Sequence, residues 1–467
     1  MSSKKLFGTD GIRAEANVYP MTGEVAMKVG RALAYTLLHH PELWVEPGSK
    51  PRSRTSKKIK IVVGKDTRRS GYMIENALSS GICSMGGEAI LLGPLPTPGV
   101  AFIAKNMRAD AGVVISASHN AFQDNGIKIF TGEGFKISDA LEAKIEELVL
   151  DPNAMYNDTP KGAGIGRAYR IEEAHGRYVV FLKSTFPQEY DLSGMKIALD
   201  CANGAAYKSA PLVFSELGAD VATMGVSPNG VNINERVGAL HPQGISEMTF
   251  HVGAQIGIAL DGDADRVVIV DEKGQVIDGD TVIGLCAMEL QKQGKLPKNA
   301  IVTTQMSNVG LELALEKVGI KMYRANVGDR FVVEMMKEQG LIFGGEQSGH
   351  MIFLDSSTTG DGTLAALKVI ELMRRTEKPL SELKNLIELY PQTLLNLKVK
   401  EKKPLSDLPS YLKAVQSAEK ELDGKGRIFV RYSGTEPKLR ILVESESETK
   451  NNKIAQSIQE AILHDIQ

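Results

Sequence analysis

Ser118 stands in the segment SASHN, directly after the apolar run AGVVI, and His119 and Lys128 follow it closely. A serine hydroxyl among small residues, with basic side chains nearby, is suited to exchange a phosphoryl group. The alternative is a polar turn without chemistry, because short motifs of this kind recur by chance. Three further segments bear on this choice.

Three carboxylates stand at alternate positions between two apolar runs, in the segment DGDADR: Asp261, Asp263 and Asp265. Carboxylates this close repel one another unless a cation compensates their charge, and hard oxygen ligands suit Mg²⁺. An EF-hand loop would need glycine where Arg266 stands, and the VVIV that follows predicts a strand. A phosphatase phosphorylated on aspartate is another alternative, but it leaves Ser118 without a role. The segment therefore predicts a magnesium site.

Two glycine-rich segments carry side chains that could bind the rest of a phosphorylated sugar. In GGEQSGH, Glu346, Ser348 and His350 alternate, so an extended backbone would turn all three toward a row of sugar hydroxyls. In RYSGTEPKLR, a glycine lets backbone N–H groups approach an anion, while hydroxyl and guanidinium groups add donors and charge. A glycine-rich turn and an ordinary hairpin connection are the alternatives. The residues of the expected phosphate site are Arg431, Ser433, Gly434, Thr435 and Arg440.

The elements that must position these segments alternate between short apolar runs and longer helical patterns, which is typical of α/β layering. KIVVG, EAILLG and AGVVIS predict strands early in the chain, and the alternation then returns twice. After a boundary at residues 379–391 the strands group differently. We therefore expect an α/β protein of four domains, three similar mixed α/β/α sheet domains followed by a smaller α+β C-terminal domain. Their expected bounds are residues 1–168, 169–274, 275–385 and 386–467.

Composition narrows the classes of partner. The 55 basic and 57 acidic residues nearly balance, so no excess charge favours nucleic acid or a membrane surface. Three scattered cysteines without CxxC spacing indicate neither a disulfide framework nor a zinc site, and they fit a reducing cytosol. No run approaches the ~18 apolar residues of a membrane helix. We therefore expect a cytoplasmic protein with a small-molecule partner.

The four segments together resemble one family closely, the α-D-phosphohexomutases. Several long motifs in the same order are hard to reconcile with an accidental match, and the family implies a central active-site cleft. The resemblance runs nearly from end to end, through FGTDGIR (7–13), GKDTR (64–68), ISASHN (115–120), DNGIK (124–128), DGDADR (261–266), GGEQSGH (344–350) and RYSGTEP (431–437).

The resemblance implies a role for each candidate residue. Ser118 resembles the family's phosphoserine, which gives its phosphoryl group to the substrate and takes one back from the other end, so the enzyme must be phosphorylated to work. Asp261, Asp263 and Asp265, with a phosphate oxygen on Ser118, look like the ligands of one Mg²⁺ ion. Lys128 is the leading candidate for proton transfer. The other implied groups are Arg13, His119, Lys128 and Arg266 around the reacting phosphoryl group, Glu346 and Ser348 for the sugar, and Arg431, Ser433, Gly434, Thr435 and Arg440 for the second phosphate.

Within the family the sequence is most similar to the branch that acts on glucosamine phosphates, judged from KLFGTDGIR, PNGVNIN (228–234), NVGDR (326–330) and Gln347. This similarity implies interconversion of glucosamine 6-phosphate and glucosamine 1-phosphate through a bisphosphorylated sugar, on the route to UDP-N-acetylglucosamine. The branch that acts on mannose and glucose phosphates is the nearest alternative, and a sugar-phosphate sensor without turnover is a further one. Relatives are often dimers, so a homodimer is one expected state.

The sequence departs from the family pattern in three places. Ala121 stands where the family usually has proline, so we expect a looser turn after Ser118. Ala14 follows GTDGIR where the family usually has glycine. Residues 40–58 form a longer basic segment than usual before KIVVG, and a solvated loop is the preferred interpretation over a partner contact.

Overall fold

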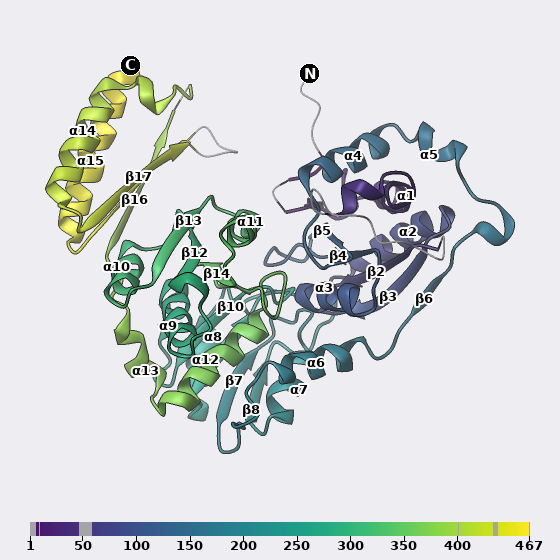
Figure 1. The fold of residues 1–467 in the computed structure, drawn as a ribbon, viewed down its shortest axis with the longest axis horizontal. Coiled ribbons are helices and arrows are strands. Elements are labelled where there is room, and N and C mark those ends of the chain that lie inside the picture. The colour runs from purple at the N-terminus through teal and green to yellow at the C-terminus, as the bar shows by residue number, and fades with distance from the viewer. Residues whose placement is uncertain (1–5, 9, 46–57, 400, 433–437, 467) are drawn as a thin grey trace. The chain divides into compact units, whose positions relative to one another are not determined.

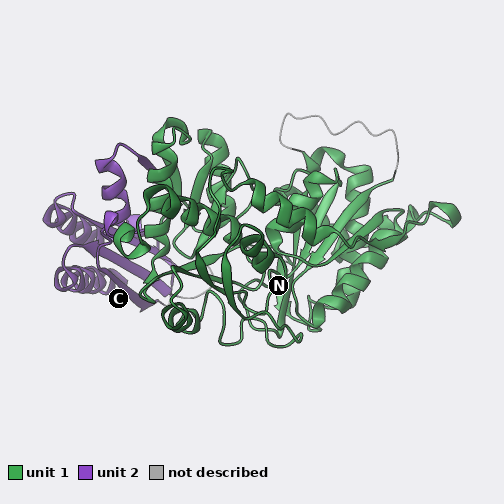
Figure 2. Cartoon of the chain, turned by 90° about the horizontal axis from the view of Figure 1, so that it is seen from below, with its two compact units in different colours: residues 1–305, 323–384 green, residues 306–322, 385–467 purple. Residues whose placement is uncertain are grey.

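The structure is a computed structural model that describes residues 6–8, 10–45, 58–399, 401–432 and 438–466. Within these residues the strands form four sheets, and helices cover them (Figure 1). The chain divides into two compact units, shown in different colours in Figure 2. Unit 1 comprises residues 1–305 and 323–384, and unit 2 comprises residues 306–322 and 385–467. Most of the basic segment at 40–58 lies outside the described residues.

The first sheet has the strand order β1-β5-β4-β2-β3-β6. Strand β4 lies parallel to β2 and antiparallel to β5, and all five of its residues are buried, as an apolar run inside a sheet requires. The strands are β1 (Ile12–Glu15), β2 (Lys60–Lys65), β3 (Glu88–Pro94), β4 (Ala111–Ile115), β5 (Asp124–Thr131) and β6 (Ala168–Arg170). The helices of this part are α1 (Gly23–His39), α2 (Ser70–Ser84), α3 (Thr97–Asn106), α4 (Asp139–Leu150) and α5 (Asn153–Asn157).

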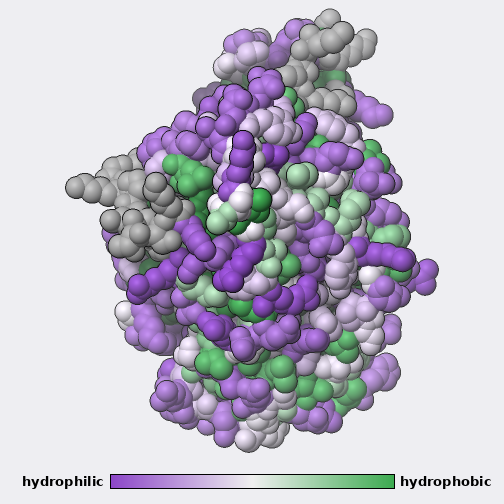
Figure 3. Space-filling view, turned by 90° about the vertical axis from the view of Figure 1, so that its right-hand side faces the viewer, coloured by the Kyte–Doolittle hydropathy of each residue, from purple (hydrophilic) through white to green (hydrophobic). Residues whose placement is uncertain are grey.

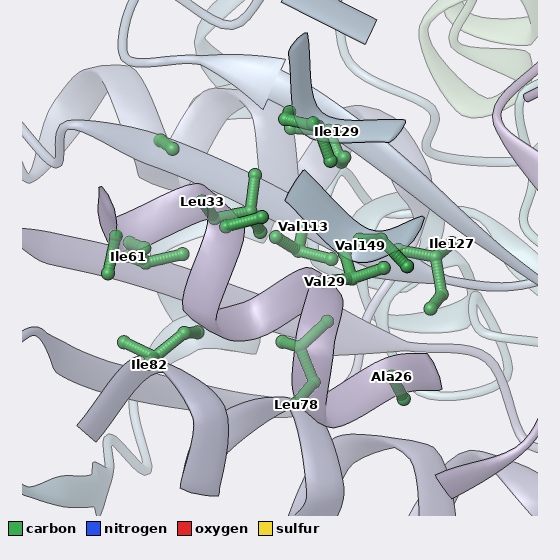
Figure 4. Packing of buried hydrophobic residues seen from close by; sticks show 14 of the residues in the cluster. Ala26, Val29, Leu33, Ile61, Leu78, Ile82, Val113, Ile127, Ile129 and Val149 are labelled. Atoms are coloured by element: carbon green, nitrogen blue, oxygen red, sulfur yellow. The ribbon is translucent and has the colours of Figure 1, made fainter. Parts of the chain in front are cut away.

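The core of this part lies where α1 and α2 pack on the sheet. Figure 4 shows Val29 and Leu33 of α1 among side chains of α2 and of the strands, and both are fully buried. The two helices approach closely, since a Cβ atom at Gly30 would lie 2.1 Å from the carbonyl oxygen of Leu78. This core fixes the edge of the sheet from which the Ser118 segment leaves β4.

The second sheet has the order β11-β10-β9-β7-β8. Strands β9 and β10 are antiparallel neighbours in which Leu260 pairs with Val267, so residues 261–266 form the loop between them. The strands are β7 (Lys196–Asp200), β8 (Asp220–Met224), β9 (Ile256–Leu260), β10 (Val267–Asp271) and β11 (Val276–Ile277). The helices are α6 (Ala174–Ser184), α7 (Ser209–Glu216) and α8 (Gln243–Val252).

The third sheet has the order β13-β12-β14-β15, and β14 and β15 form an antiparallel hairpin. The strands are β12 (Ala300–Thr304), β13 (Lys321–Ala325), β14 (Phe343–Glu346) and β15 (His350–Phe353). The helices are α9 (Gly279–Lys292), α10 (Val309–Lys317), α11 (Asp329–Gln339), α12 (Gly362–Thr376) and α13 (Leu380–Leu383). Helix α10 belongs to unit 2, which the sequence pattern does not indicate.

Unit 2 contains an antiparallel sheet of order β16-β18-β17. Ile441 and Val443 of β18 are fully buried in one cluster with Ile458 of α15. The border between the units, at Lys384 and Asn385, falls inside the boundary expected from the sequence. The elements are β16 (Gln392–Lys398), β17 (Gly426–Tyr432), β18 (Lys438–Ser445), α14 (Pro409–Leu422) and α15 (Glu448–Ile466).

The expected α/β class is confirmed, with a smaller α+β part at the C-terminus. The face shown in Figure 3 is mostly hydrophilic, and its hydrophobic residues lie in small separate groups. Among the described residues, no helix combines the length and apolar character needed to span a bilayer.

Candidate active site

The loop that carries Ser118 follows the buried strand β4 and is held by its own side chains. The Ser118 N–H donates to Ser116 Oγ at 2.9 Å, and Ser116 Oγ donates to Asp66 Oδ2 at 2.6 Å. Ser118 has a left-handed backbone with φ of 51° and is 2% exposed. This conformation is unfavourable for a residue with a side chain, so the surroundings must stabilise it.

The hydroxyl of Ser118 points to the triple-aspartate loop. Ser118 Oγ donates a hydrogen bond to Asp261 Oδ2 at 2.6 Å, and His119 Nδ1 lies 3.3 Å from the same oxygen of Ser118. The two loops come from different sheets and pack tightly, because a Cβ atom at Gly262 would lie 2.5 Å from the carbonyl oxygen of Ser118. The fold therefore places the expected phosphoryl carrier directly beside the expected metal ligands.

The three carboxylates fit a divalent cation. Asp261, Asp263 and Asp265 are buried, and each offers an oxygen within 4.8 Å of the others. Burial raises the pKa of Asp261 well above its usual value, and the charges of Asp265 and Asp263 raise it further. Among the described residues, Asp263 Oδ1 is buried without a hydrogen-bond partner, although Thr97 Oγ1 donates to its Oδ2 at 2.6 Å. A hard cation would bind this oxygen and stabilise the ionised carboxylates, so the donor set fits Mg²⁺.

Arg266 closes the triple-aspartate loop, and Ala264 turns it with φ of 58°. The Arg266 N–H donates to Asp261 Oδ1 at 3.2 Å. Burial lowers the pKa of Arg266, but Asp265, Asp261 and Glu346 outweigh it, so the pKa stays above its usual value. Val267–Asp271 form strand β10, so the backbone after Arg266 is extended and does not continue as the ligand loop that an EF-hand would need.

Lys128 stands on β5 and is buried against the same loop. Its Nζ lies 2.9 Å from Asp263 Oδ2, 3.3 Å from Asp265 Oδ2 and 3.3 Å from Asp10 Oδ2. Burial lowers its pKa, but these carboxylates outweigh burial and hold the pKa well above its usual value. Lys128 is therefore a fixed cation here, and it must lose its proton before it can act as a base.

Arg13 and His119 are the other basic residues of the site, and they differ in charge. Arg13 Nη2 donates to Asp10 Oδ2, and Lys136 bridges Asp10 to Asp329 of α11, with 2.7 Å from Nζ to Asp329 Oδ2. Burial lowers the pKa of His119, and the charges of Arg266 and Arg13 lower it further. His119 is therefore a neutral hydrogen-bonding group near neutral pH.

The expected sugar-binding segment differs in shape from the prediction. Glu346 and His350 are paired across the β14–β15 hairpin, with a turn at 347–349, so the backbone is not extended through the segment. His350 is buried, and its Nε2 accepts from the Gly360 N–H at 3.1 Å, whereas Ser348 in the turn is exposed. The prediction of an extended backbone is wrong, because residues 347–349 form a turn, but Glu346 and His350, as directly opposite partners, lie on one face of the hairpin.

A cavity of about 240 Å³ joins the hairpin turn to the triple-aspartate loop. Its polar lining is His119, Asp261, Arg266, Gln347 and Ser348, and its apolar lining includes Leu240 and Val268. The Glu346 carboxylate accepts from the Gly328 N–H at 3.0 Å, just before α11. A lining that combines polar and aliphatic groups suits a phosphorylated sugar.

The expected phosphate site belongs to unit 2. Arg431 and Arg440 are direct partners across β17 and β18, and burial together with the charge of Arg440 lowers the pKa of Arg431. Like charges opposite each other in a sheet are unfavourable unless an anion compensates them. Ser433, Gly434 and Thr435, predicted members of this site, lie outside the described residues.

Sequence reasoning missed several residues that hold the site. Asp10, Arg68, Asn234 and Asp329 lie in FGTDGIR, GKDTR, PNGVNIN and NVGDR, motifs that marked the resemblance but received no roles. These motifs were the sequence signal that could have pointed to the four residues. No such signal marked Thr97 at the start of α3, because a threonine beside a proline is common at a helix start.

Four family profiles match the chain in order and together cover most of it. They are the phosphoglucomutase/phosphomannomutase alpha/beta/alpha domains I, II and III, at residues 4–154, 177–274 and 278–390, and the C-terminal domain at 394–461. The chain belongs to the phosphoglucomutase/phosphomannomutase family. The resemblance to the phosphohexomutases is thus confirmed, and the protein is an isomerase of this family with three α/β/α domains and a C-terminal domain.

Relatives within the family are similar over nearly their whole length. A phosphoglucosamine mutase of Myxococcus xanthus is 53% identical over 461 residues, covering 99% of this chain and 97% of the relative. A phosphoglucosamine mutase of Pelobacter propionicus is 55% identical over 443 residues, covering 95% of this chain and 94% of the relative. Within the family, the chain is therefore most like the phosphoglucosamine mutases.

Solved structures of the family share the fold at low sequence identity. A phosphoglucomutase/phosphomannomutase family protein of Burkholderia thailandensis has a TM-score of 0.80 at 22% identity, covering 100% of this chain and 98% of that one. The N-acetylphosphoglucosamine mutase of Aspergillus fumigatus, in complex with GlcNAc-6P and magnesium, has a TM-score of 0.66 at 17% identity, covering 99% and 96%. The arrangement of elements is therefore that of the family.

Proposed function

We propose that this protein interconverts glucosamine 6-phosphate and glucosamine 1-phosphate through a phosphorylated Ser118 and a bisphosphorylated glucosamine. The observation that carries the proposal is the 2.6 Å hydrogen bond from Ser118 Oγ to Asp261 in a buried carboxylate cluster. The names of relatives that are 53% and 55% identical support the choice of the amino sugar. The sugar phosphate and magnesium bound by the fungal relative are consistent with the same chemistry.

The reaction balances without a co-reactant. In the first half, the phosphorus–Oγ bond of phosphoserine 118 breaks, a bond from phosphorus to the sugar C1 hydroxyl oxygen forms, and the hydroxyl proton is passed on to Ser118 Oγ. In the second half, the bond from phosphorus to the C6 oxygen breaks, a bond from phosphorus to Ser118 Oγ forms, and the serine proton passes to the C6 oxygen. The bisphosphorylated sugar must turn around between the two halves.

The protein's contribution is mainly positioning and charge stabilisation. Bound at Asp261, Asp263 and Asp265, Mg²⁺ would supply positive charge to the transferring phosphoryl oxygens. Arg13, Arg266 and Lys128 add fixed positive charge, which suits a transition state with negative charge on the phosphoryl oxygens. Glu346 and Ser348 are proposed to bind sugar hydroxyls. Arg431, Ser433, Gly434, Thr435 and Arg440 are proposed to hold the phosphate that is not reacting.

The charges of Lys128 and His119 suit them to different proton-transfer roles. Lys128, held as an ammonium, can donate to the sugar oxygen that is released when the phosphoryl group leaves. His119, which is neutral and 3.3 Å from Ser118 Oγ, can accept a proton at that oxygen. We therefore propose that Lys128 is the acid and that His119 is the second proton carrier.

Intact mass spectrometry and a coupled assay test the proposal together. We expect the protein to carry one phosphoryl group, and we expect Ser118→Ala to lose both this group and turnover. Ser80→Ala is the matched control, because Ser80 is an exposed serine of α2 whose hydroxyl donates to the Asn76 carbonyl within the same helix. Turnover that survives in Ser118→Ala would refute the phosphoserine mechanism and favour another nucleophile.

The substrate is tested by comparing kcat/KM for glucosamine, glucose and mannose 6-phosphates. We expect the highest value for glucosamine 6-phosphate. A higher value for glucose or mannose would assign the chain to the other branch of the family. Phosphorylation of Ser118 without turnover of any of the three would favour the sugar-phosphate sensor. The cytoplasmic location, the homodimer and the domain bounds 1–168, 169–274, 275–385 and 386–467 stay predictions.

A further inference from the structure

The carbonyl oxygens of the Ser118 loop are gathered by one buried guanidinium. Arg68 Nη2 donates to the carbonyl oxygens of Ser118 at 3.0 Å and of Asn120 at 2.8 Å. Its Nη1 donates to the carbonyl oxygens of Ala121 and Asp124, the latter at 3.1 Å. The turn that lacks the family's proline at 121, which we expected to be looser, is thus held by hydrogen bonds from Arg68.

Asn234 reaches the same two carbonyl oxygens from the second sheet's side. Asn234 Nδ2 donates to Ser118 O at 2.9 Å and to Asn120 O at 3.0 Å. Asn234 is 8% exposed and has φ of 59°, a left-handed conformation that asparagine tolerates better than most residues. A buried amide that donates hydrogen bonds to two backbone carbonyl oxygens of another domain indicates a specific positioning role.

The segment that carries Asn234 is itself docked on the GKDTR loop. The Arg69 N–H donates to the Gly230 carbonyl at 2.9 Å, and Thr67 Oγ1 donates to the Asn203 carbonyl at 2.5 Å. The Asn234 N–H donates to the Ala202 carbonyl at 2.9 Å, which ties the segment to the end of β7. Two motifs without a chemical role, GKDTR and PNGVNIN, thus meet at the backbone of the phosphoserine loop.

We propose that Asn234, together with Arg68, is a positioning residue that fixes the backbone of residues 118–121, so that Ser118 Oγ stays aimed at the triple-aspartate loop during phosphoryl transfer. The left-handed Ser118 needs external support, and the two side chains supply it by holding the carbonyl groups on either side of His119. The inference rests on the proposed function, because it assumes that Ser118 carries the phosphoryl group.

Asn234 is the better residue to test. Arg68 also pairs with the buried Asp66, with 2.8 Å between Nε and Oδ2, so its removal would leave a buried carboxylate without its cation. Asn234→Gly removes the amide and keeps a residue that accepts positive φ. Asn234→Asp keeps the shape but places a carboxylate oxygen against two carbonyl oxygens. Asn229→Ala, an exposed position of the same segment, is the matched control.

The experiment measures kcat, KM for glucosamine 6-phosphate, and the rate at which glucose 1,6-bisphosphate phosphorylates dephosphorylated Ser118, followed by intact mass. For Asn234→Gly we expect kcat and the phosphorylation rate to fall about tenfold, with KM changed less than about twofold. For Asn234→Asp we expect a loss at least as large. Asn229→Ala should match the wild type in all three measurements.

The order of the two variants separates positioning from simple packing. If Asn234 only fills space, Asn234→Asp should behave like the wild type and Asn234→Gly should be the worse variant, and that order would overturn the inference. Wild-type phosphorylation rates in Asn234→Gly would overturn it as well. If wild-type protein takes up no phosphoryl group on Ser118, the proposed function fails instead, so the two failures are distinguishable.

Discussion

The contact between the triple-aspartate loop and the phosphoserine loop leaves no room for a side chain at Gly262. A Cβ atom there would lie 2.5 Å from the Ser118 carbonyl oxygen, 2.8 Å from Asn234 Nδ2 and 2.9 Å from Ile233 Cδ1. The backbone at Gly262 does not have positive φ, so the substitution Gly262→Ala acts through these close contacts and not through backbone strain. Relief of the contact with the carbonyl oxygen requires the two loops to separate by about 0.5 to 0.9 Å.

This displacement is large for the chemistry. The hydrogen bond from Ser118 Oγ to Asp261 is 2.6 Å long, and a further 0.5 to 0.9 Å, about the relief estimated above, would lengthen it to the limit of a hydrogen bond or beyond. A misplacement of about 1 Å can reduce a rate by about 100-fold, which corresponds to about 2.7 kcal/mol in the activation barrier. We therefore expect kcat of Gly262→Ala to fall by about 100-fold while KM changes little.

The coupled mutase assay at saturating Mg²⁺ checks this expectation. The control is Gly176→Ala in helix α6, where a Cβ atom meets nothing within 4 Å and where alanine should stabilise the helix by up to about 1 kcal/mol. Circular dichroism should show both variants folded. A kcat for Gly262→Ala within threefold of the wild type would refute the reasoning that the loop spacing is set by this contact.

Two further changes test the charges. Lys128→Met removes the cation that lies 2.9 Å from Asp263 and 3.3 Å from Asp265. Mg²⁺ should therefore raise the Tm of this variant more than that of the wild type or of the control Lys144→Met, a partly exposed lysine of α4 that pairs with Glu147, and equal shifts would contradict this. Asp361 has its pKa raised to about 6 by burial, so the folded state binds more protons between about pH 4 and pH 6, and stability should fall as pH rises through this window. Asp361→Asn should flatten that part of the profile of Tm against pH, and an unchanged slope would show that another group titrates there.

Much of the site was predictable because its chemistry is local in the sequence. The DGDADR spacing indicates a cation whatever the fold, since three carboxylates on one short loop repel without one. The run AGVVI followed by SASHN indicates a buried strand that ends in a reactive loop, and β4 confirms the strand. Apolar periodicity likewise predicted the α/β layers, because side-chain burial follows the period of each element.

The prediction of an extended backbone through GGEQSGH was wrong for a physical reason. Alternation along GGEQSGH places side chains on one face only if the backbone stays extended, but the turn at 347–349 folds the segment into a hairpin. Whether a glycine-rich segment turns depends on which strand lies beside it, and strand pairing is a tertiary property. The same applies to α10, whose sequence gives no sign that it belongs to unit 2.

The sequence by itself determined the kinds of groups that act here: a hydroxyl and three carboxylates on short loops, and basic residues near them in short motifs. These groups can be recognised in the sequence because the residues of each motif are neighbours in the chain. The tertiary structure decided which loops contact one another, and it decided the charge states of the side chains buried between them. Ser118 and Asp261 are 143 residues apart, and Arg68 and Asn234, which are far apart in the sequence, donate to the same two carbonyl oxygens. Such contacts depend on the close packing of whole domains, and burial among carboxylates, which fixes Lys128 as a cation, exists only once that packing has formed.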